Sequence, residues 1–151
     1  MLKAIKKKRI VPYSSYQMFD LVDNIEQYSS FLPWCRKSHI HKRTDKEVEA
    51  SLIVGFRGID KTFSTLNTLK RPREIEIQLI DGPFRSLNGL WSFSDINKRE
   101  SEIQLNLQFE ILISPLSHIF ESFFEQIVNS QISAFEDRAK DLYSKTLKEM
   151  D

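Results

Sequence analysis

The hydrophobic positions along the 151-residue chain follow two periods, and the first change of period comes early. Residues 14–23 carry apolar side chains three and four positions apart, directly after two serines that can cap a helix, Ser14 and Ser15. This spacing predicts a short amphipathic helix. Residues 25–31 predict a second short helical turn, which ends before Pro33 because proline disfavours helix for the residue that precedes it.

The middle of the chain alternates apolar and polar side chains at every second residue. The alternation runs through residues 47–56, 59–69, 73–80, 84–93 and 101–111. A period of two is typical of strands that bury one face. The joins between these segments are short and contain Gly, Pro, Asp or Asn, which favours an antiparallel meander.

After Ser114 and Pro115 the period returns to 3.6, with Ser114 as the expected cap and Pro115 in the first turn. One stripe of mainly apolar residues predicts a helix of roughly thirty residues, about 45 Å long. The stripe consists of Leu116, Phe120, Phe123, Ile127, Gln131, Phe135 and Leu142. We therefore expect an α+β fold in a single domain over residues 1–151. A curved antiparallel sheet of about six to seven strands would wrap around this C-terminal helix, with two short helices after the first strand.

Composition agrees with a folded domain, since 40% of the residues are hydrophobic and 28% are charged. The net charge of +1 predicts no general attraction to nucleic acid, and no DNA partner is expected. The single cysteine cannot form an internal disulfide. The basic N-terminus lacks the apolar segment of a secretion signal, so we expect a cytoplasmic protein, with peripheral contact to a membrane as an open alternative.

Four stretches in fixed order resemble the START-like proteins of the coenzyme Q-binding and ribosome-association toxin (RatA) family. They are VPYSSYQMFDLVDNIEQYSSFLPWC (11–35), GFRGIDKTFSTLNTL (55–69), DGPFRSLNGLWSF (81–93) and FEQIVNSQISAFEDRAKDLY (124–143). The resemblance covers nearly the whole chain. One departure is Leu66, where members of the family often carry a basic residue, so a polar partner contact at that position is in doubt.

The resemblance implies a helix-grip fold with an apolar cavity between the sheet and the long helix. It also implies a non-enzymatic protein that binds ubiquinone or another isoprenoid lipid and supports its delivery to the respiratory chain. The alternative that it implies is a toxin that binds the large ribosomal subunit and blocks subunit joining. No cofactor is required in either case, and ubiquinone is the expected ligand in the first.

Polar residues on the inward parity of the predicted sheet indicate a cavity. Thr65 and Asn67 stand among apolar positions, and Gly89 beside Trp91 leaves room for a neighbour or for a ligand. The predicted ligand-binding residues from the sheet and the helix are Phe63, Thr65, Asn67, Leu87, Trp91, Phe93, Phe109, Phe120, Phe124 and Ile127. Ordinary core packing explains the same apolar residues equally well, and this alternative stays open.

The segment FLPWC carries three large apolar side chains, Phe31, Leu32 and Trp34, where Pro33 predicts a turn. Exposed apolar side chains of this size require a cover. The segment is therefore either a plug that seals one end of the core or a mobile lid that touches an isoprenoid tail or a membrane.

The opening segment carries five basic residues, namely Lys3, Lys6, Lys7, Lys8 and Arg9. They favour an edge strand that is protected from aggregation by charge. Contact with anionic lipid or ribosomal RNA is the alternative. Cys35, His39 and His41 match no zinc motif, and no phosphate loop or nucleophile motif is present, so neither a metal site nor a catalytic residue is predicted.

Overall fold

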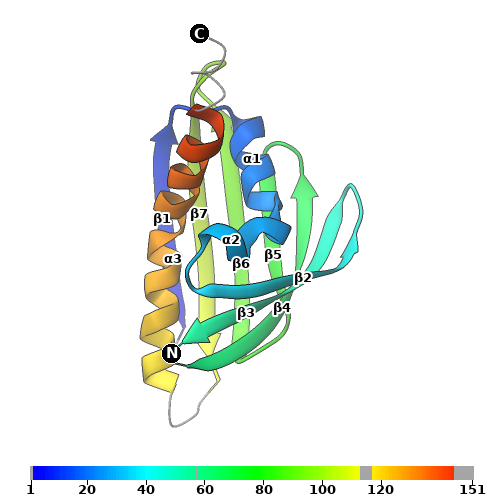
Figure 1. Cartoon of the computed structure of the whole chain (residues 1–151), viewed down its shortest axis with the longest axis vertical. Helices are drawn as coiled ribbons and strands as arrows, with labels where there is room; N and C mark the ends of the chain where they lie inside the picture. Colours follow the sequence, from blue (N-terminus) through cyan, green and yellow to red (C-terminus); the bar gives the residue numbers. More distant parts are fainter. Residues whose placement is uncertain (1, 57, 113–116, 145–151) are drawn as a thin grey trace.

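The computed structural model describes residues 2–56, 58–112 and 117–144, which form a curved sheet packed against a long helix (Figure 1). The strands are β1 (Lys3–Val11), β2 (Cys35–Arg43), β3 (Glu47–Phe56), β4 (Ile59–Lys70), β5 (Glu74–Asp81), β6 (Phe84–Asp95) and β7 (Ser101–Ile111). Neighbouring strands are antiparallel in the order β1-β7-β6-β5-β4-β3-β2, so β1 and β2 form the two edges of the sheet.

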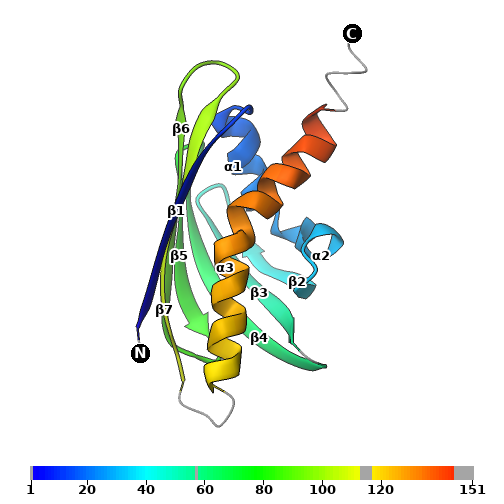
Figure 2. The same ribbon diagram turned by 90° about the vertical axis from the view of Figure 1, so that its left-hand side faces the viewer.

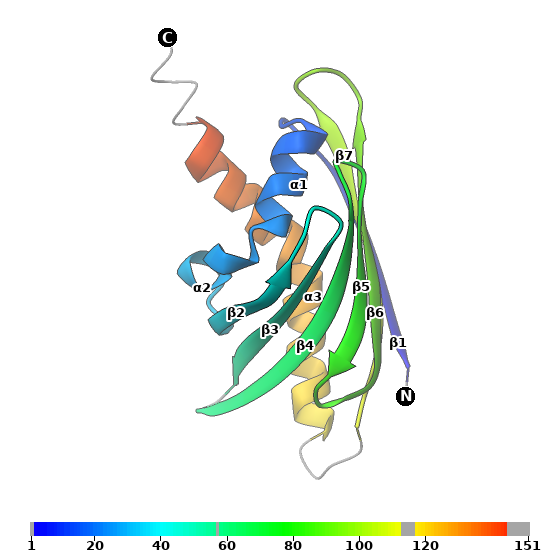
Figure 3. The same cartoon turned by 90° about the vertical axis from the view of Figure 1, so that its right-hand side faces the viewer.

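The helices all lie on the concave side of this sheet (Figures 2 and 3). They are α1 (Ser15–Asp23), the 3-10 turn η1 (Ile25–Gln27), α2 (Tyr28–Phe31), α3 (Ser117–Ala139) and the short π-helical segment η2 (Lys140–Ser144). The expected α+β architecture is therefore confirmed, with seven strands in the part of the chain that the structure describes. No helix within these residues is long and apolar enough to cross a membrane.

The start of α1 follows directly from its sequence. The Ser14 hydroxyl accepts a hydrogen bond from the Gln17 backbone N–H (3.2 Å), and the Ser14 backbone N–H donates to Gln17 Oε1 (2.9 Å). This reciprocal capping box satisfies two donors that would otherwise lack partners. The apolar face of the helix is buried through Met18 and Phe19 among others. The predictions of this helix and of the turn that follows it are both confirmed.

The alternation in β3 to β7 also buries the expected face. Ala50, Phe63 and Ile75 are examples of buried residues whose sequence neighbours are more exposed. The parity of β4 is maintained, but its first residues extend beyond the core, because Ile59 and Lys61 are exposed while Phe63 onward is buried.

Strand β2 was not among the predicted strands. Of its nine residues only Cys35 is buried, and the register shifts between Cys35 and Lys37 and again between Ile40 and Lys42. An edge strand that leaves the core exposes both of its faces, so its side chains show no apolar alternation for a pattern to detect.

Helix α3 lies across the concave face and spans 23 residues, and η2 continues it directly from Lys140 to Ser144. Its buried face consists of Phe120, Phe124, Ile127, Val128, Ile132, Phe135 and Ala139. The expected cap at Ser114, the proline at 115 and the stripe residue Leu116 lie outside the described residues. The final predicted stripe residue, Leu142, belongs to η2 and is exposed.

Candidate functional site: a cavity between the sheet and α3

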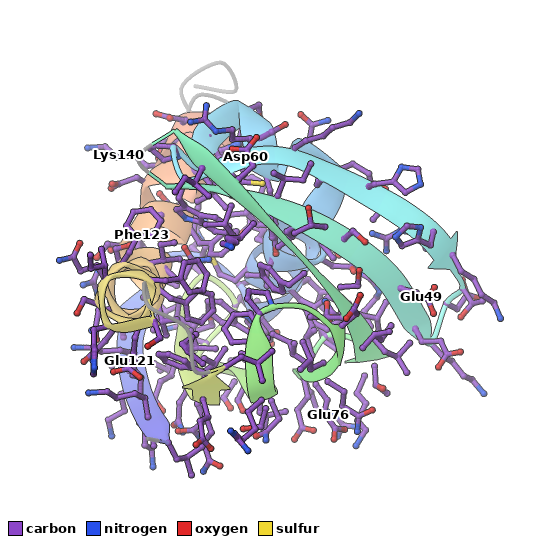
Figure 4. The ribbon with its side chains drawn as sticks, turned by 90° about the horizontal axis from the view of Figure 1, so that it is seen from below. Glu49, Asp60, Glu76, Glu121, Phe123 and Lys140 are labelled. Atoms are coloured by element: carbon purple, nitrogen blue, oxygen red, sulfur yellow. The ribbon has the colours of Figure 1, made fainter. Side chains whose placement is uncertain are left out.

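An apolar cavity of about 90 Å³ lies between the concave face of the sheet and α3. Strands β3 to β7, α3 and the segment from η1 to Trp34 all contribute side chains to its wall. Seen from below in Figure 4, side chains fill most of the space between α3, marked by Glu121 and Phe123, and the sheet. The cavity is thus smaller than the roughly 300–1,000 Å³ typical of ligand pockets.

Two polar side chains form a pair in this wall. Thr65 and Asn67 follow one another on the inward face of β4, and both are buried. The Thr65 hydroxyl donates to Asn67 Oδ1 at 3.1 Å. Among the described residues, the Asn67 amide Nδ2 has no hydrogen-bond partner, which leaves two donors available at an apolar surface. Such donors favour a ligand that carries an acceptor oxygen.

Aromatic rings make up a large part of the surrounding packing. The Trp91 ring meets the Phe135 ring edge to face at 5.5 Å and stacks beside Phe93 at 6.1 Å. The room predicted beside Gly89 is taken by a neighbour, because a Cβ at this position would lie 3.1 Å from Leu107 Cδ1. The cavity therefore results from the fit between α3 and the sheet and not from this glycine.

The FLPWC segment closes one part of the cavity wall. Trp34 is half-buried, lines the cavity and donates from Nε1 to Gln131 Oε1 of α3 at 3.3 Å. Phe31 packs on Phe135 with ring centroids 5.7 Å apart, and the Arg138 guanidinium lies 4.9 Å from the Phe31 centroid. The segment is fastened to one face of α3 through residues 131, 135 and 138, which are spaced one turn apart.

Tyr28 supports this segment from inside. Its hydroxyl donates to the Val22 carbonyl, and its ring meets Phe135 at 5.5 Å. Burial, with the nearby Asp23 carboxylate, raises the pKa of the Tyr28 phenol, so the group remains a neutral donor. The phenol thereby holds the end of α1 against α2.

Eight of the predicted ligand-binding residues lie in the cavity wall. They are Trp34, Phe63, Thr65, Asn67, Leu87, Trp91, Phe124 and Ile127. Five others lie elsewhere: Leu32, Phe93, Phe109 and Phe120 are buried in the core, and Phe31 is half-buried beside Arg138. Contact of any of these side chains with a ligand remains a prediction.

Ten further residues line the cavity without having been predicted to do so. They are Ile25, Tyr28, Ala50, Leu52, Ile77, Leu105, Leu107, Val128, Gln131 and Phe135. Strand parity already placed the five sheet residues on the inward face. The others depend on how α3 and α2 lie over the sheet, which no local pattern specifies.

The basic opening segment forms the edge strand β1, as expected. Two of its charges are balanced by α3, because Arg9 Nη1 lies 2.6 Å from Glu136 Oε1 and Lys3 Nζ lies 3.7 Å from Glu125 Oε2. Lys6, Lys7 and Lys8 are exposed and have no ion pair among the described residues. The segment therefore does not present all five charges on one free surface.

Cys35 and the two histidines do not converge. Cys35 is buried, and burial raises the pKa of its thiol to about 11. His39 and His41 are exposed on β2. Within residues 2–56, 58–112 and 117–144, no group of three or more His, Cys, Asp or Glu side chains is arranged to hold a metal ion.

A curved antiparallel sheet that grips a long C-terminal helix around an apolar cavity defines a START-like protein. A solved START superfamily protein from Mycobacterium smegmatis shares this fold, with a TM-score of 0.78 at 18% identity over 92% of this chain and 98% of that one. Residues 11–136 match the sequence model of the family described as polyketide cyclase / dehydrase and lipid transport, and the chain belongs to this family.

Two curated relatives carry functional names. The Ribosome association toxin RatA of Escherichia coli (strain K12) is 35% identical over 144 residues, which cover 95% of this chain and 91% of that protein. The mitochondrial coenzyme Q-binding protein COQ10 of Drosophila melanogaster is 30% identical over 85% of this chain and 55% of that protein. The family resemblance noted in the sequence is thus confirmed.

Proposed function

We propose that this protein binds ubiquinone, or a similar polyisoprenoid lipid, in the cavity beneath α3 and supports its delivery to the respiratory chain. The observation that carries the proposal is the Thr65–Asn67 pair, which places free amide donors inside a mostly apolar wall. The family description, which includes lipid transport, and the name of the COQ10 relative support the same reading.

A quinone suits this wall because its flat ring carries carbonyl acceptors and its tail is hydrocarbon. Asn67 Nδ2 would donate to one carbonyl, while Trp91 and Phe63 would pack against the ring and tail. A neutral hydrogen bond of this kind contributes about 0.5–1.5 kcal/mol. Binding of this kind makes and breaks no covalent bond, so the proposed role requires no catalytic residue.

The cavity has to widen to accept such a ligand, because about 90 Å³ is below the size of a ligand pocket. The lining side chains Trp34, Leu52 and Gln131 are only half-buried, so they can move toward solvent at the smallest cost in lost packing. The proposal therefore includes displacement of Trp34 when the lipid enters. Action in the cytoplasm, with temporary contact to a membrane, is part of the same proposal.

The test is organic extraction of the purified protein followed by mass spectrometry, together with titration of the stripped protein with a short-chain ubiquinone. The double variant Thr65→Val and Asn67→Leu preserves shape but removes both polar groups, so it should weaken quinone affinity about tenfold. The matched control, Thr68→Val with Asn88→Leu, changes the same residue types on the outer face and should bind normally.

Two results would count against this role. Quinone affinity that is equal in the cavity variant and its control would remove the part assigned to Thr65 and Asn67. A wild-type protein that neither co-purifies with an isoprenoid lipid nor binds one in titration would contradict the carrier function itself.

We infer ribosome association as a second candidate function. The observation that favours it is the 35% identity to the RatA protein, which extends over nearly the full length of both chains. In this role the protein would bind the large ribosomal subunit and inhibit translation by blocking subunit joining. Overexpression should then reduce the joined-ribosome peak in sucrose gradients, and an unchanged profile with no protein in the large-subunit fractions would contradict it.

A further inference from the structure

The outer face of the sheet carries a polar hollow that the cavity does not use. Ala50 and Leu52 line the cavity, so Ser51 and Ile53 of the same strand point to the opposite face. On that face is a hollow of about 160 Å³, which we call the β2 hollow; it is lined by Lys37, Ser38, His39, Ser51, Ile53 and Thr62. By strand parity Ser51 and Ile53 share their face of β3 with Glu49, which Figure 4 labels.

The register of three strands brings these side chains together. Lys37 pairs with Ile53, which pairs with Thr62, and in the next row His39 pairs with Ser51. The hollow thus offers one ammonium, one imidazole and the hydroxyls of Ser51 and Thr62, and no carboxylate lines it. Lysine and hydroxyl side chains are the usual partners of phosphate oxygens.

A hydrogen-bond chain orders the polar groups beside the hollow. His41 Nε2 lies 2.6 Å from Ser51 Oγ, and Ser51 Oγ lies 2.5 Å from Ser64 Oγ. The His39 and His41 rings meet edge to face with centroids 4.7 Å apart. The second imidazole is therefore held next to the first, and together they present an aromatic surface at the rim of the hollow.

The Arg and Lys side chains of β2 give the strand a net positive charge. The strand contains Arg36, Lys37, Lys42 and Arg43 and no acidic residue. Arg36 is neutralised by Asp60 (2.8 Å) and Arg43 by Asp23 (3.0 Å). Lys37 and Lys42 have no ion pair among the described residues, although Glu49 lies opposite Lys42 in the register. The positive charge at Lys37 is therefore uncompensated where the hollow opens.

We propose that the β2 hollow binds phosphodiester groups of single-stranded or looped RNA, an inference that rests on the ribosome association proposed above and gives it a surface. Lys37 and the hydroxyls of Ser51 and Thr62 would contact phosphate oxygens, and a base would stack on the His39–His41 pair. The β2–β3 hairpin projects from the body on the side away from α3 (Figure 1).

The same surface does not suit a phospholipid membrane. Residues 35–53 include no exposed large hydrophobic side chain that could insert among acyl chains. RNA recognition needs no such side chain, because affinity comes from phosphate contacts and stacking. The hollow and the cavity lie on opposite faces of the sheet, so RNA and a lipid would not compete for one site.

The test uses the full-length protein and a fluorescein-labelled oligouridylate, with binding followed by anisotropy at several KCl concentrations. The double variant Lys37→Gln and His39→Gln should lower affinity about tenfold and reduce the slope of log K against log salt by about one. The matched control is Lys98→Gln, an exposed lysine in the β6–β7 turn, and it should leave both values nearly unchanged. Circular dichroism confirms that each variant is folded.

Equal affinity and equal salt slope in the wild type and the Lys37/His39 variant would overturn the inference. Binding to anionic phospholipid vesicles that depends on Lys37, without RNA binding, would overturn the assignment to RNA. Ribosome cosedimentation separates the two proposals. If the wild type and the variant cosediment equally, the hollow inference fails and ribosome association stands. If the wild type binds oligouridylate through Lys37 but does not cosediment with ribosomes, the hollow inference stands and ribosome association fails.

Discussion

Cys35 illustrates how strongly one residue depends on its position in this fold. Its side chain is 3% exposed at the first position of β2, and its Sγ lies 3.6 Å from the Lys37 carbonyl oxygen. Burial raises the pKa of the thiol to about 11, because the thiolate would lose its hydration. At neutral pH the group is therefore a small apolar side chain and not a nucleophile.

This burial predicts a loss of stability at alkaline pH. Below pH 9 the thiol is protonated in both the folded and the unfolded chain, so its full contribution is present. Between pH 9 and pH 11 only the folded chain keeps the proton, and the free energy of unfolding falls as pH rises. The contribution of one such group is at most about 1.4 kcal/mol per pH unit.

Urea unfolding at pH 7, 9 and 10 measures this effect. Cys35→Ala should flatten the decline between pH 9 and pH 10, where Tyr28 has not yet begun to contribute strongly. A decline of the same slope in the variant and the wild type would show that the thiol is not the group responsible.

The elements that could be predicted from the sequence are those that bury one face. The capped helix α1 and strands β3 to β7 each place apolar residues at the period of their own geometry, and the structure confirms them. Strand β2 could not be predicted in this way, because its pairing depends on β3 and its own side chains remain outside the core. The contribution of β2 to the β2 hollow could not be predicted for the same reason.

The candidate site could be predicted only in part, and the reason is again physical. Parity identifies which sheet residues point inward, but a cavity wall and a packed core use the same apolar side chains. Phe93 and Phe109 satisfy the same pattern as Phe63 and Trp91, yet they pack in the core beside the cavity. Only the polar residues Thr65 and Asn67 distinguished the site, since a dry core rarely contains such a pair.

The contact between α1 and the far edge of the sheet depends on a buried carboxylate. Asp23 is 6% exposed and accepts hydrogen bonds from Arg43 Nη1 (3.0 Å) and Arg71 Nη2 (2.9 Å). Arg43 Nη2 also donates to the Asp23 carbonyl oxygen at 2.9 Å. Asp23 thereby joins the end of α1 to β2 and to the β4–β5 turn, and it holds the segment that leads into α2.

Asp23→Asn should therefore destabilise the protein by about 2 kcal/mol. The reason is that Arg43 and Arg71 lose the negative charge of the buried carboxylate that both of them contact. The arginines are partly exposed, so the loss is smaller than for a fully buried pair. The control is Glu26→Gln, which removes an exposed carboxylate 3.0 Å from the same Arg43 and should cost about 0.5 kcal/mol or less. Urea midpoints that shift equally in both variants would contradict this difference.

At the scale of the whole molecule, the two faces of the sheet have separate chemistry. The concave face holds the apolar cavity under α3, and the outer face near β2 holds hydroxyls, imidazoles and a free lysine. Successive side chains of a strand point to opposite faces of the sheet. Ala50 and Ser51 are neighbours in sequence and therefore lie on different surfaces. The two proposed functions, lipid binding and RNA recognition, would therefore use separate surfaces of one small domain.

The proposed entry of a lipid past Trp34 would depend on how firmly the FLPWC segment is held against α3. The Trp34–Gln131 hydrogen bond, at 3.3 Å, is the polar contact that fastens Trp34 to the helix. Gln131→Leu removes it while keeping a side chain of similar length, at a cost of about 1 kcal/mol, and quinone uptake should become about fivefold faster. Gln126→Leu changes an exposed glutamine of the same helix and serves as the control.

The two tryptophans allow the movement to be observed directly. In a Trp91→Phe background Trp34 is the one remaining indole, so a short-chain ubiquinone should shift its emission to the red and make it more accessible to acrylamide. Gln131→Leu should show higher acrylamide accessibility of Trp34 even without quinone, because the hydrogen bond between Trp34 and Gln131 is absent. Emission that stays constant while quinone binds would mean that the lipid enters by another path, and that Trp34 is a fixed part of the wall.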